Sequence, residues 1–151
     1  DPEVLPAHIG GMFLDRTSDT IHDPLFARAL VLDGGAVRVA IVIADNLMMP
    51  RSLLDEAKQK ASKETGIAVE NILIAATHTH SAPAAMGCLG TPADTNYVRI
   101  LASRLALSVR EANQRLAPAR AGWGVEEDWK HTFCRRWIRR PGQFEIGRAH
   151  V

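Results

Sequence analysis

The feature that most constrains the fold is an apolar run at Val37–Ala44, with the sequence Val-Arg-Val-Ala-Ile-Val-Ile-Ala. Its length suits one β-strand, and a nearly unbroken apolar run is typical of a strand that is covered on both faces. A second apolar run, Leu25–Leu32, precedes it and leads into Asp33-Gly34-Gly35, which is a strong turn signal. The two runs therefore predict a β-hairpin, and a strand covered on both faces needs flanking helices.

A helix is predicted directly after this hairpin. Pro50 precedes it, Ser52 is expected to cap it and Gly66 is expected to end it. The residues between place leucines and alanines on one face, acidic residues early and lysines late, an order that suits the helix dipole. An apolar run at 72–76 then predicts a third strand, and a helix between two strands implies a parallel crossover.

A longer helix is predicted from Asp94 or Thr95 to about Leu116, because apolar residues recur there at spacings of three and four. Pro118 ends this helix, and residues 119–125 predict a final strand. The expected order is β-hairpin, helix, strand, helix, strand. We therefore expect an α/β fold with a mixed sheet.

Composition excludes several classes of protein. The chain has 151 residues, of which 46% are hydrophobic and 23% charged, so it lies outside the disordered range and can bury a core without disulfides. No apolar run is long enough for a transmembrane helix. A formal net charge of +1 gives no general attraction to nucleic acid. Cys88 and Cys134 form no recognisable motif, and whether they pair is left open.

The last residues, 145–151, are expected to be non-native. Their sequence, Glu-Ile-Gly-Arg-Ala-His-Val, is encoded by a common sequencing adapter, AGATCGGAAGAGCACACGTC, when one preceding G completes the first codon. We therefore expect the natural protein to continue beyond Phe144. The chain also begins at Asp1 without a signal peptide.

The segment with the clearest chemical content is His78-Thr79-His80, which follows the predicted strand at 72–76. In extended backbone, residues i and i+2 point to the same side, so two imidazoles are expected to project together. Ligands bind at the ends of strands in α/β sheets, and imidazole is a common zinc ligand. The alternative is that one histidine is a hydrogen-bonded loop residue and the other is exposed.

A zinc site needs at least three protein ligands. His8 and His22 are further candidates within the chain. Asp45 ends a buried run, where a carboxylate can face the same crevice as the histidines, although it can equally be a helix or turn cap. His131 lies in a basic segment and His150 in the expected non-native tail, so neither is expected to take part.

Three segments carry a resemblance to a known family: Ile21–Leu30, the strand end Ala44-Asp45, and Ala75–Pro83, with the sequence Ala-Ala-Thr-His-Thr-His-Ser-Ala-Pro. Over residues 9–140 the chain resembles the neutral/alkaline non-lysosomal ceramidases, although Ala82 stands where the family usually has glycine. The resemblance implies that residues 1–144 are the N-terminal part of a zinc-dependent catalytic domain. Such a domain hydrolyses an N-acylsphingosine to sphingosine and a fatty acid.

The resemblance also implies roles for single residues. His78 corresponds to a zinc ligand, and His80 to a histidine near the bound water and the substrate. Asp45 and Arg136 are further expected site residues; Arg136 belongs to a Cys-Arg-Arg segment that replaces the Asn-Arg-Arg of many bacterial relatives. The family's other ligands, a His, a Glu and a Tyr, lie later than this chain extends. Residues 1–144 alone are therefore expected to bind zinc weakly and to hydrolyse nothing, and to expose apolar surface.

The expected partner is a lipid amide, and the family resemblance implies contact with a membrane surface and secretion or export to the periplasm. The oligomeric state is left open. One alternative keeps the fold but changes the substrate to another N-acyl compound or an ester. A second alternative uses Lys130–Arg140, which holds five cations and two aromatic residues, to bind a membrane surface or nucleic acid. We expect this segment to be a solvated strand face instead, with no nucleic acid bound.

Overall fold

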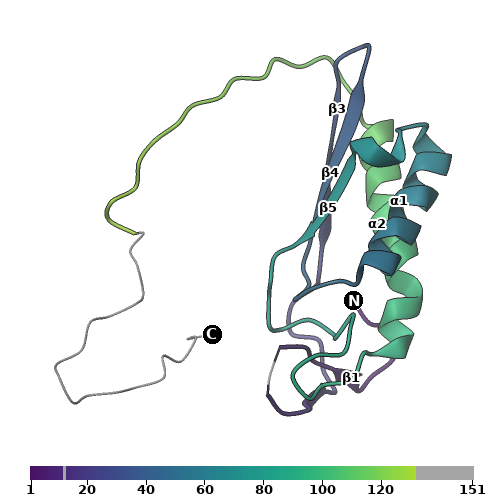
Figure 1. Ribbon diagram of the computed structural model, residues 1–151, viewed down its shortest axis with the longest axis vertical. Helices are drawn as coiled ribbons and strands as arrows, with labels where there is room; N and C mark the ends of the chain where they lie inside the picture. Colours follow the sequence, from purple (N-terminus) through teal and green to yellow (C-terminus); the bar gives the residue numbers. More distant parts are fainter. Residues whose placement is uncertain (12, 132–151) are drawn as a thin grey trace. The chain divides into compact units, whose positions relative to one another are not determined.

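The computed structural model describes residues 1–11 and 13–131 (Figure 1). In chain order its elements are β1 (Ala7–His8), β2 (Thr17–Ser18), β3 (Ala27–Asp33), β4 (Arg38–Ala44), α1 (Arg51–Thr65), the short 3-10 helix η1 (Val69–Asn71), β5 (Ile72–Ala76) and α2 (Thr95–Gln114). The structure divides into a unit of Asp1–Ala117, which contains all of these elements, and a second unit that begins at Pro118. The α/β class expected from the sequence is confirmed.

The sheet of the first unit has the order β3-β4-β5. β3 and β4 pair antiparallel, with Leu30 opposite Ile41, and form the predicted hairpin. The turn requires glycine at Gly35, whose φ of 84° is left-handed, and its N–H donates to Asp33 Oδ1 at 2.9 Å. β4 and β5 pair parallel, with Ile41 opposite Leu73, and α1 makes the crossover between them. The sheet is therefore mixed, as expected.

The helix ends follow local chemistry, with one correction. Ser52 does not cap α1: the helix begins earlier, after Pro50, whose φ of −69° already suits a helix start, and Ser52 lies inside its first turn. Gly66 ends α1 as expected, with a left-handed φ of 75°. For α2 the structure selects Asp94 over Thr95 as the cap, because the Asp94 carboxylate accepts the Tyr97 N–H at 2.9 Å.

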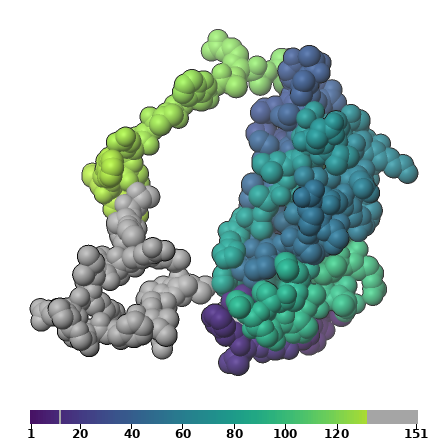
Figure 2. Space-filling model, viewed as in Figure 1, coloured from purple at the N-terminus to yellow at the C-terminus, as the bar shows by residue number. Residues whose placement is uncertain are grey.

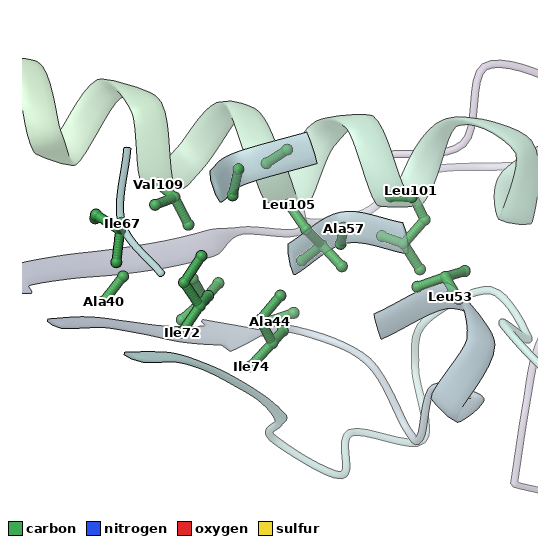
Figure 3. Close-up of a cluster of buried hydrophobic side chains, with 14 of the residues drawn as sticks. Ala40, Ala44, Leu53, Ala57, Ile67, Ile72, Ile74, Leu101, Leu105 and Val109 are labelled. Carbon is green, nitrogen blue, oxygen red and sulfur yellow. The ribbon is translucent and has the colours of Figure 1, made fainter. Parts of the chain in front are cut away.

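The hydrophobic core lies between the sheet and the described helices, which cover the same face of it (Figure 1). In Figure 3 the side chains of Leu101, Leu105 and Val109 on α2 point toward Ala40 and Ala44 of β4. Leu105 and Val109 are fully buried, at 0% exposure. This packing confirms the apolar stripe that predicted α2.

The opposite face of the sheet corrects the expectation that β4 is covered on both faces. On that face Leu30 of β3 and Leu73 of β5 flank Ile41, and these two leucines are 53% and 56% exposed. Successive strand residues point to opposite faces, so an unbroken apolar run supplies one covered face and one face that the described residues leave exposed. Exposed apolar surface was expected for this chain, and this face provides it.

The predicted strand at Ala119–Val125 is wrong. Residues 118–131 contain no helix or strand, and Trp123 is 93% exposed. A strand needs a partner for its backbone N–H and C=O groups, and apolar side chains alone do not provide one. Within residues 1–11 and 13–131, no helix has both the length and the apolar character needed to cross a membrane.

Candidate functional site

The candidate site lies where β4 and β5 end. Because these strands are parallel, Asp45 and the loop that begins at Thr77 leave the sheet at the same edge. The N-terminal segment packs against this loop (Figures 1 and 2): Ile9 bridges Pro83, and the Ala84 N–H donates to the His8 carbonyl at 2.7 Å. Residues far apart in sequence are thereby brought to one end of the first unit.

His78 and His80 lie together, although not by the route that the sequence suggested. His78 has a left-handed φ of 66°, so the segment is not the extended backbone assumed for residues i and i+2. The two rings nevertheless meet edge to face, with centroids 5.1 Å apart and planes at 82°. A left-handed conformation is uncommon for a residue with a side chain and is frequent at functional sites.

Each histidine is oriented by a backbone carbonyl. His78 Nδ1 lies 3.1 Å from the Leu47 carbonyl oxygen, and His80 Nδ1 lies 3.0 Å from that of Gly11. A carbonyl oxygen can only accept, so Nδ1 donates in both rings and carries the hydrogen. In a neutral imidazole, Nε2 then keeps the lone pair. Metal-binding histidines are commonly oriented in this way, with one ring nitrogen donating to a backbone carbonyl and the other left for the metal.

The chemistry of His78 fits one ligand of a zinc site. Zinc binds the unprotonated nitrogen of a neutral imidazole, and with Nδ1 on the Leu47 carbonyl that nitrogen is His78 Nε2. The His80 ring, with its centroid 5.1 Å from that of His78, lies directly beside it. Among residues 1–11 and 13–131, however, no three His, Cys, Asp or Glu side chains are grouped so that they could hold a metal.

The further histidine candidates lie outside the pair. His8 Nδ1 lies 2.8 Å from Asp15 Oδ1, and its ring is therefore engaged by that carboxylate. His22 is almost fully exposed, with its nearest recorded charged partner, Asp23, at 3.9 Å. The structure thus brings together His78 and His80, but neither His8 nor His22 completes a ligand set with them.

Asp45 is held firmly at the end of β4. Its Oδ2 accepts the Phe26 N–H at 3.0 Å and a hydrogen bond from Arg28 at 2.9 Å, and Arg28 also donates to its Oδ1 at 3.0 Å. The Arg28 guanidinium stacks over the Phe26 ring at 4.6 Å. Asp45 therefore ties the start of β3 to the end of β4, which is a structural role other than the helix or turn cap that the sequence left open, and it also lines the cleft described next.

A cleft of about 710 Å³ opens beside His80. This volume lies within the range of about 300–1,000 Å³ for small-molecule sites. Its lining combines apolar and polar side chains. The apolar residues include Leu5, Ile9, Ile21 and Leu25, and the polar ones include Asp45, His80, Thr79, Ser81, Arg16 and His22. Asp45 was expected from the sequence to face the same crevice as the histidines, and both Asp45 and His80 line this cleft.

Asn46, directly after Asp45, forms a buried polar pair with Tyr97 that the sequence did not predict. Asn46, at 0% exposure, donates from Nδ2 to the Tyr97 hydroxyl at 3.0 Å, and its Oδ1 has no hydrogen-bond partner among the described residues. Burial raises the pKa of Tyr97, which outweighs the hydrogen bond from Asn46. The neighbouring Asp94 carboxylate also accepts the His8 N–H at 3.1 Å. An Asn directly after Asp45 was the available signal, because a polar residue at the end of a buried run needs a partner.

Several expected residues lie outside the described part of the chain. These are Arg136, Cys134, His150 and most of the Lys130–Arg140 segment. His131 is described, and its Nδ1 lies 3.0 Å from Asp128 Oδ2. In the comparisons with known proteins, no family model matches the chain and no solved structure matches it.

Proposed function

We propose that this chain belongs to a zinc-dependent hydrolase of amide bonds, of the kind implied by its resemblance to the neutral ceramidases. His78 is the proposed zinc ligand, and His80 the proposed neighbour of the bound water and the substrate. The observation that carries the proposal is the histidine pair: two adjacent imidazoles, each with Nδ1 on a backbone carbonyl and with no hydrogen bond to Nε2 from the described residues. The cleft beside His80 supports it, because a substrate has room there.

The proposed chemistry assigns His80 a proton-transfer role that its hydrogen bond favours. When bound, zinc lowers the pKa of water toward about 7 and polarises a carbonyl. With its Nδ1 hydrogen committed to Gly11, neutral His80 has a lone pair on Nε2 and can accept a proton there. Once protonated, the same Nε2 can donate to the developing oxyanion or to the leaving amine.

The proposal places the other zinc ligands and Arg136 outside the described residues. It follows that the chain as given binds zinc weakly and hydrolyses nothing, because His78 alone falls short of the three protein ligands of a catalytic zinc site and the described residues hold no group that could complete them. Turnover of an N-acylsphingosine by this chain, with tight stoichiometric zinc, would contradict the proposed division of the ligand set.

The decisive experiment uses the gene extended past the codon for Phe144. The His78→Ala variant is compared with the parent for zinc content and for hydrolysis of N-acylsphingosines, other N-acyl compounds and esters. His8→Ala is the matched control, because His8 is a histidine of the same end of the fold whose ring contacts Asp15 and not the pair. We expect zinc to be lost in the first variant and retained in the second. Stoichiometric zinc in His78→Ala would refute the ligand assignment.

The same substrate panel decides between the lipid amide and the alternative substrates. Hydrolysis of N-acylsphingosine in preference to the other compounds would support the ceramidase-like reading. Preference for a different N-acyl compound or an ester would keep the zinc chemistry and change the substrate class. Membrane contact and export stay predictions from the family resemblance.

A further inference from the structure

The segment His8–Gly11 is pinned beside the histidine loop by backbone contacts. The Gly10 N–H donates to the Ala82 carbonyl at 3.2 Å, and the Ala84 N–H donates to the His8 carbonyl at 2.7 Å. On its other side, the Ile9 N–H donates to the Arg16 carbonyl at 2.8 Å. These bonds fix the path of the chain up to Gly11. The backbone directly before the Gly11 carbonyl is therefore held in place by contacts within the chain itself.

Gly11 faces the imidazole of His80 directly. Its carbonyl oxygen lies 3.0 Å from His80 Nδ1, across 69 residues of sequence. The space between them excludes a side chain: a Cβ built on Gly11 would lie 2.5 Å from Nδ1 and 3.0 Å from Cγ of the same ring. Gly11 also has a φ of 91°, a conformation that other residues rarely adopt. Both the backbone conformation and the contact thus require glycine.

We infer that Gly11 is a positioning residue that selects the Nδ1–H tautomer of His80 and thereby keeps the lone pair on Nε2, in a ring that lines the cleft. The inference rests on the proposed function for what His80 does, but the geometry that carries it is independent of zinc. A carbonyl acceptor at Nδ1 disfavours the opposite tautomer, because that tautomer would set an Nδ1 lone pair against the oxygen. The absence of a side chain at Gly11 lets the ring approach closely enough for this selection.

The test reads the tautomer of His80 by long-range ¹H–¹⁵N correlation on the zinc-free chain, at a pH above about 8 where histidine is largely neutral. His80→Gln assigns the signals by difference. Gly11→Ala is the test variant, and Gly35→Ala is its matched control. Gly35 has a similar left-handed φ of 84°, but a Cβ there meets nothing within 4 Å. The control thus carries the backbone strain without the collision.

We expect His80 to be in the Nδ1–H tautomer in the parent chain and in Gly35→Ala. In Gly11→Ala we expect loss of that preference, with signals of the Nε2–H tautomer appearing.

Two results would overturn the inference. One is an Nε2–H tautomer for His80 in the parent chain, and the other is an unchanged Nδ1–H tautomer in a folded Gly11→Ala variant. If Gly11→Ala does not fold, the tautomer of the parent chain decides alone. Failure of the proposed function would be seen separately, as zinc retained in His78→Ala or no hydrolysis by the extended protein, with the tautomer of His80 unaffected.

Discussion

Tyr97→Phe should destabilise the fold through Asn46 and not through lost packing. The ring of Tyr97 is 4% exposed and is kept in the variant, so the core volume barely changes. The hydroxyl, however, is the recorded partner of Asn46 Nδ2 at 3.0 Å, and the Oδ1 of that amide is already without a partner among the described residues. Removing the hydroxyl leaves the Asn46 amide, at 0% exposure, without a hydrogen-bond partner among the described residues for either Nδ2 or Oδ1.

The expected cost follows from that count. A buried donor left unsatisfied costs about 1–3 kcal/mol, which lowers the folding equilibrium constant by about 5–150-fold. Replacing both partners by apolar groups is much less costly than removing one. The double variant Tyr97→Phe with Asn46→Leu should therefore be more stable than the sum of the single effects implies.

The assay is urea unfolding monitored by far-UV circular dichroism. The dependence of the unfolding free energy on urea concentration must be the same in parent and variant, so that a shifted midpoint reports a change in stability. Tryptophan fluorescence is a poor probe here, because Trp123 and Trp129 are 93% and 83% exposed and lie outside the core. A Tyr97→Phe variant within about 0.5 kcal/mol of the parent would refute the reasoning. So would single effects that simply add in the double variant, because the two groups would then not be coupled.

Three further outcomes follow from the same structure. Tyr97 is the single tyrosine and burial raises its pKa, so the stability that depends on its neutral form should be complete below about pH 10 and be lost as the pH rises through the folded-state pKa. The pH midpoint of tyrosinate absorbance should therefore be higher in the native than in the urea-unfolded chain, and equal midpoints would contradict this. Leu105→Ala should lower the free energy of unfolding in urea by about 2–5 kcal/mol, and Leu73→Ala by about 1 kcal/mol or less, because these leucines are 0% and 56% exposed. Equal losses would mean that the exposed face of the sheet is covered in solution. Asp94→Ala should lower the free energy of unfolding by about 2 kcal/mol because the α2 cap is lost, whereas Thr95→Ala, at an exposed position, should lower it by less than about 0.5 kcal/mol. If Thr95→Ala instead lowers the melting temperature more than Asp94→Ala does, Thr95 is the cap.

Most of the first unit was predictable because its signals are local. The hairpin, α1, β5 and α2 follow from apolar periodicity and from turn or cap residues within a few positions of each element, and Gly66 and Asp94 act where the sequence placed them. The predicted strand at 119–125 failed for the complementary reason. Its apolar residues were a local signal, but a strand exists only when a partner pairs with it.

The candidate site was predictable only in part. The motif at 78–80 identified the histidines, and the buried run identified Asp45, since both are readable as residue type and spacing. The left-handed φ of His78 could not be predicted, because extended backbone is the usual conformation after a strand and residues other than glycine seldom adopt a left-handed one. Glycine at position 11 was also unremarkable in sequence, and its importance depends on a ring 69 residues away.

The amino-acid sequence by itself therefore determined the elements, the hairpin turn and the residues capable of metal or acid–base chemistry, because each depends on neighbours in the chain. Only the tertiary structure decided which face of the sheet the helices cover, which carbonyl orients each imidazole, and that Asn46 depends on Tyr97, 51 residues away. Those features are pairings between distant segments. Such pairings form only when the chain folds and brings segments that are far apart in sequence into contact, and no local pattern encodes which segments will meet.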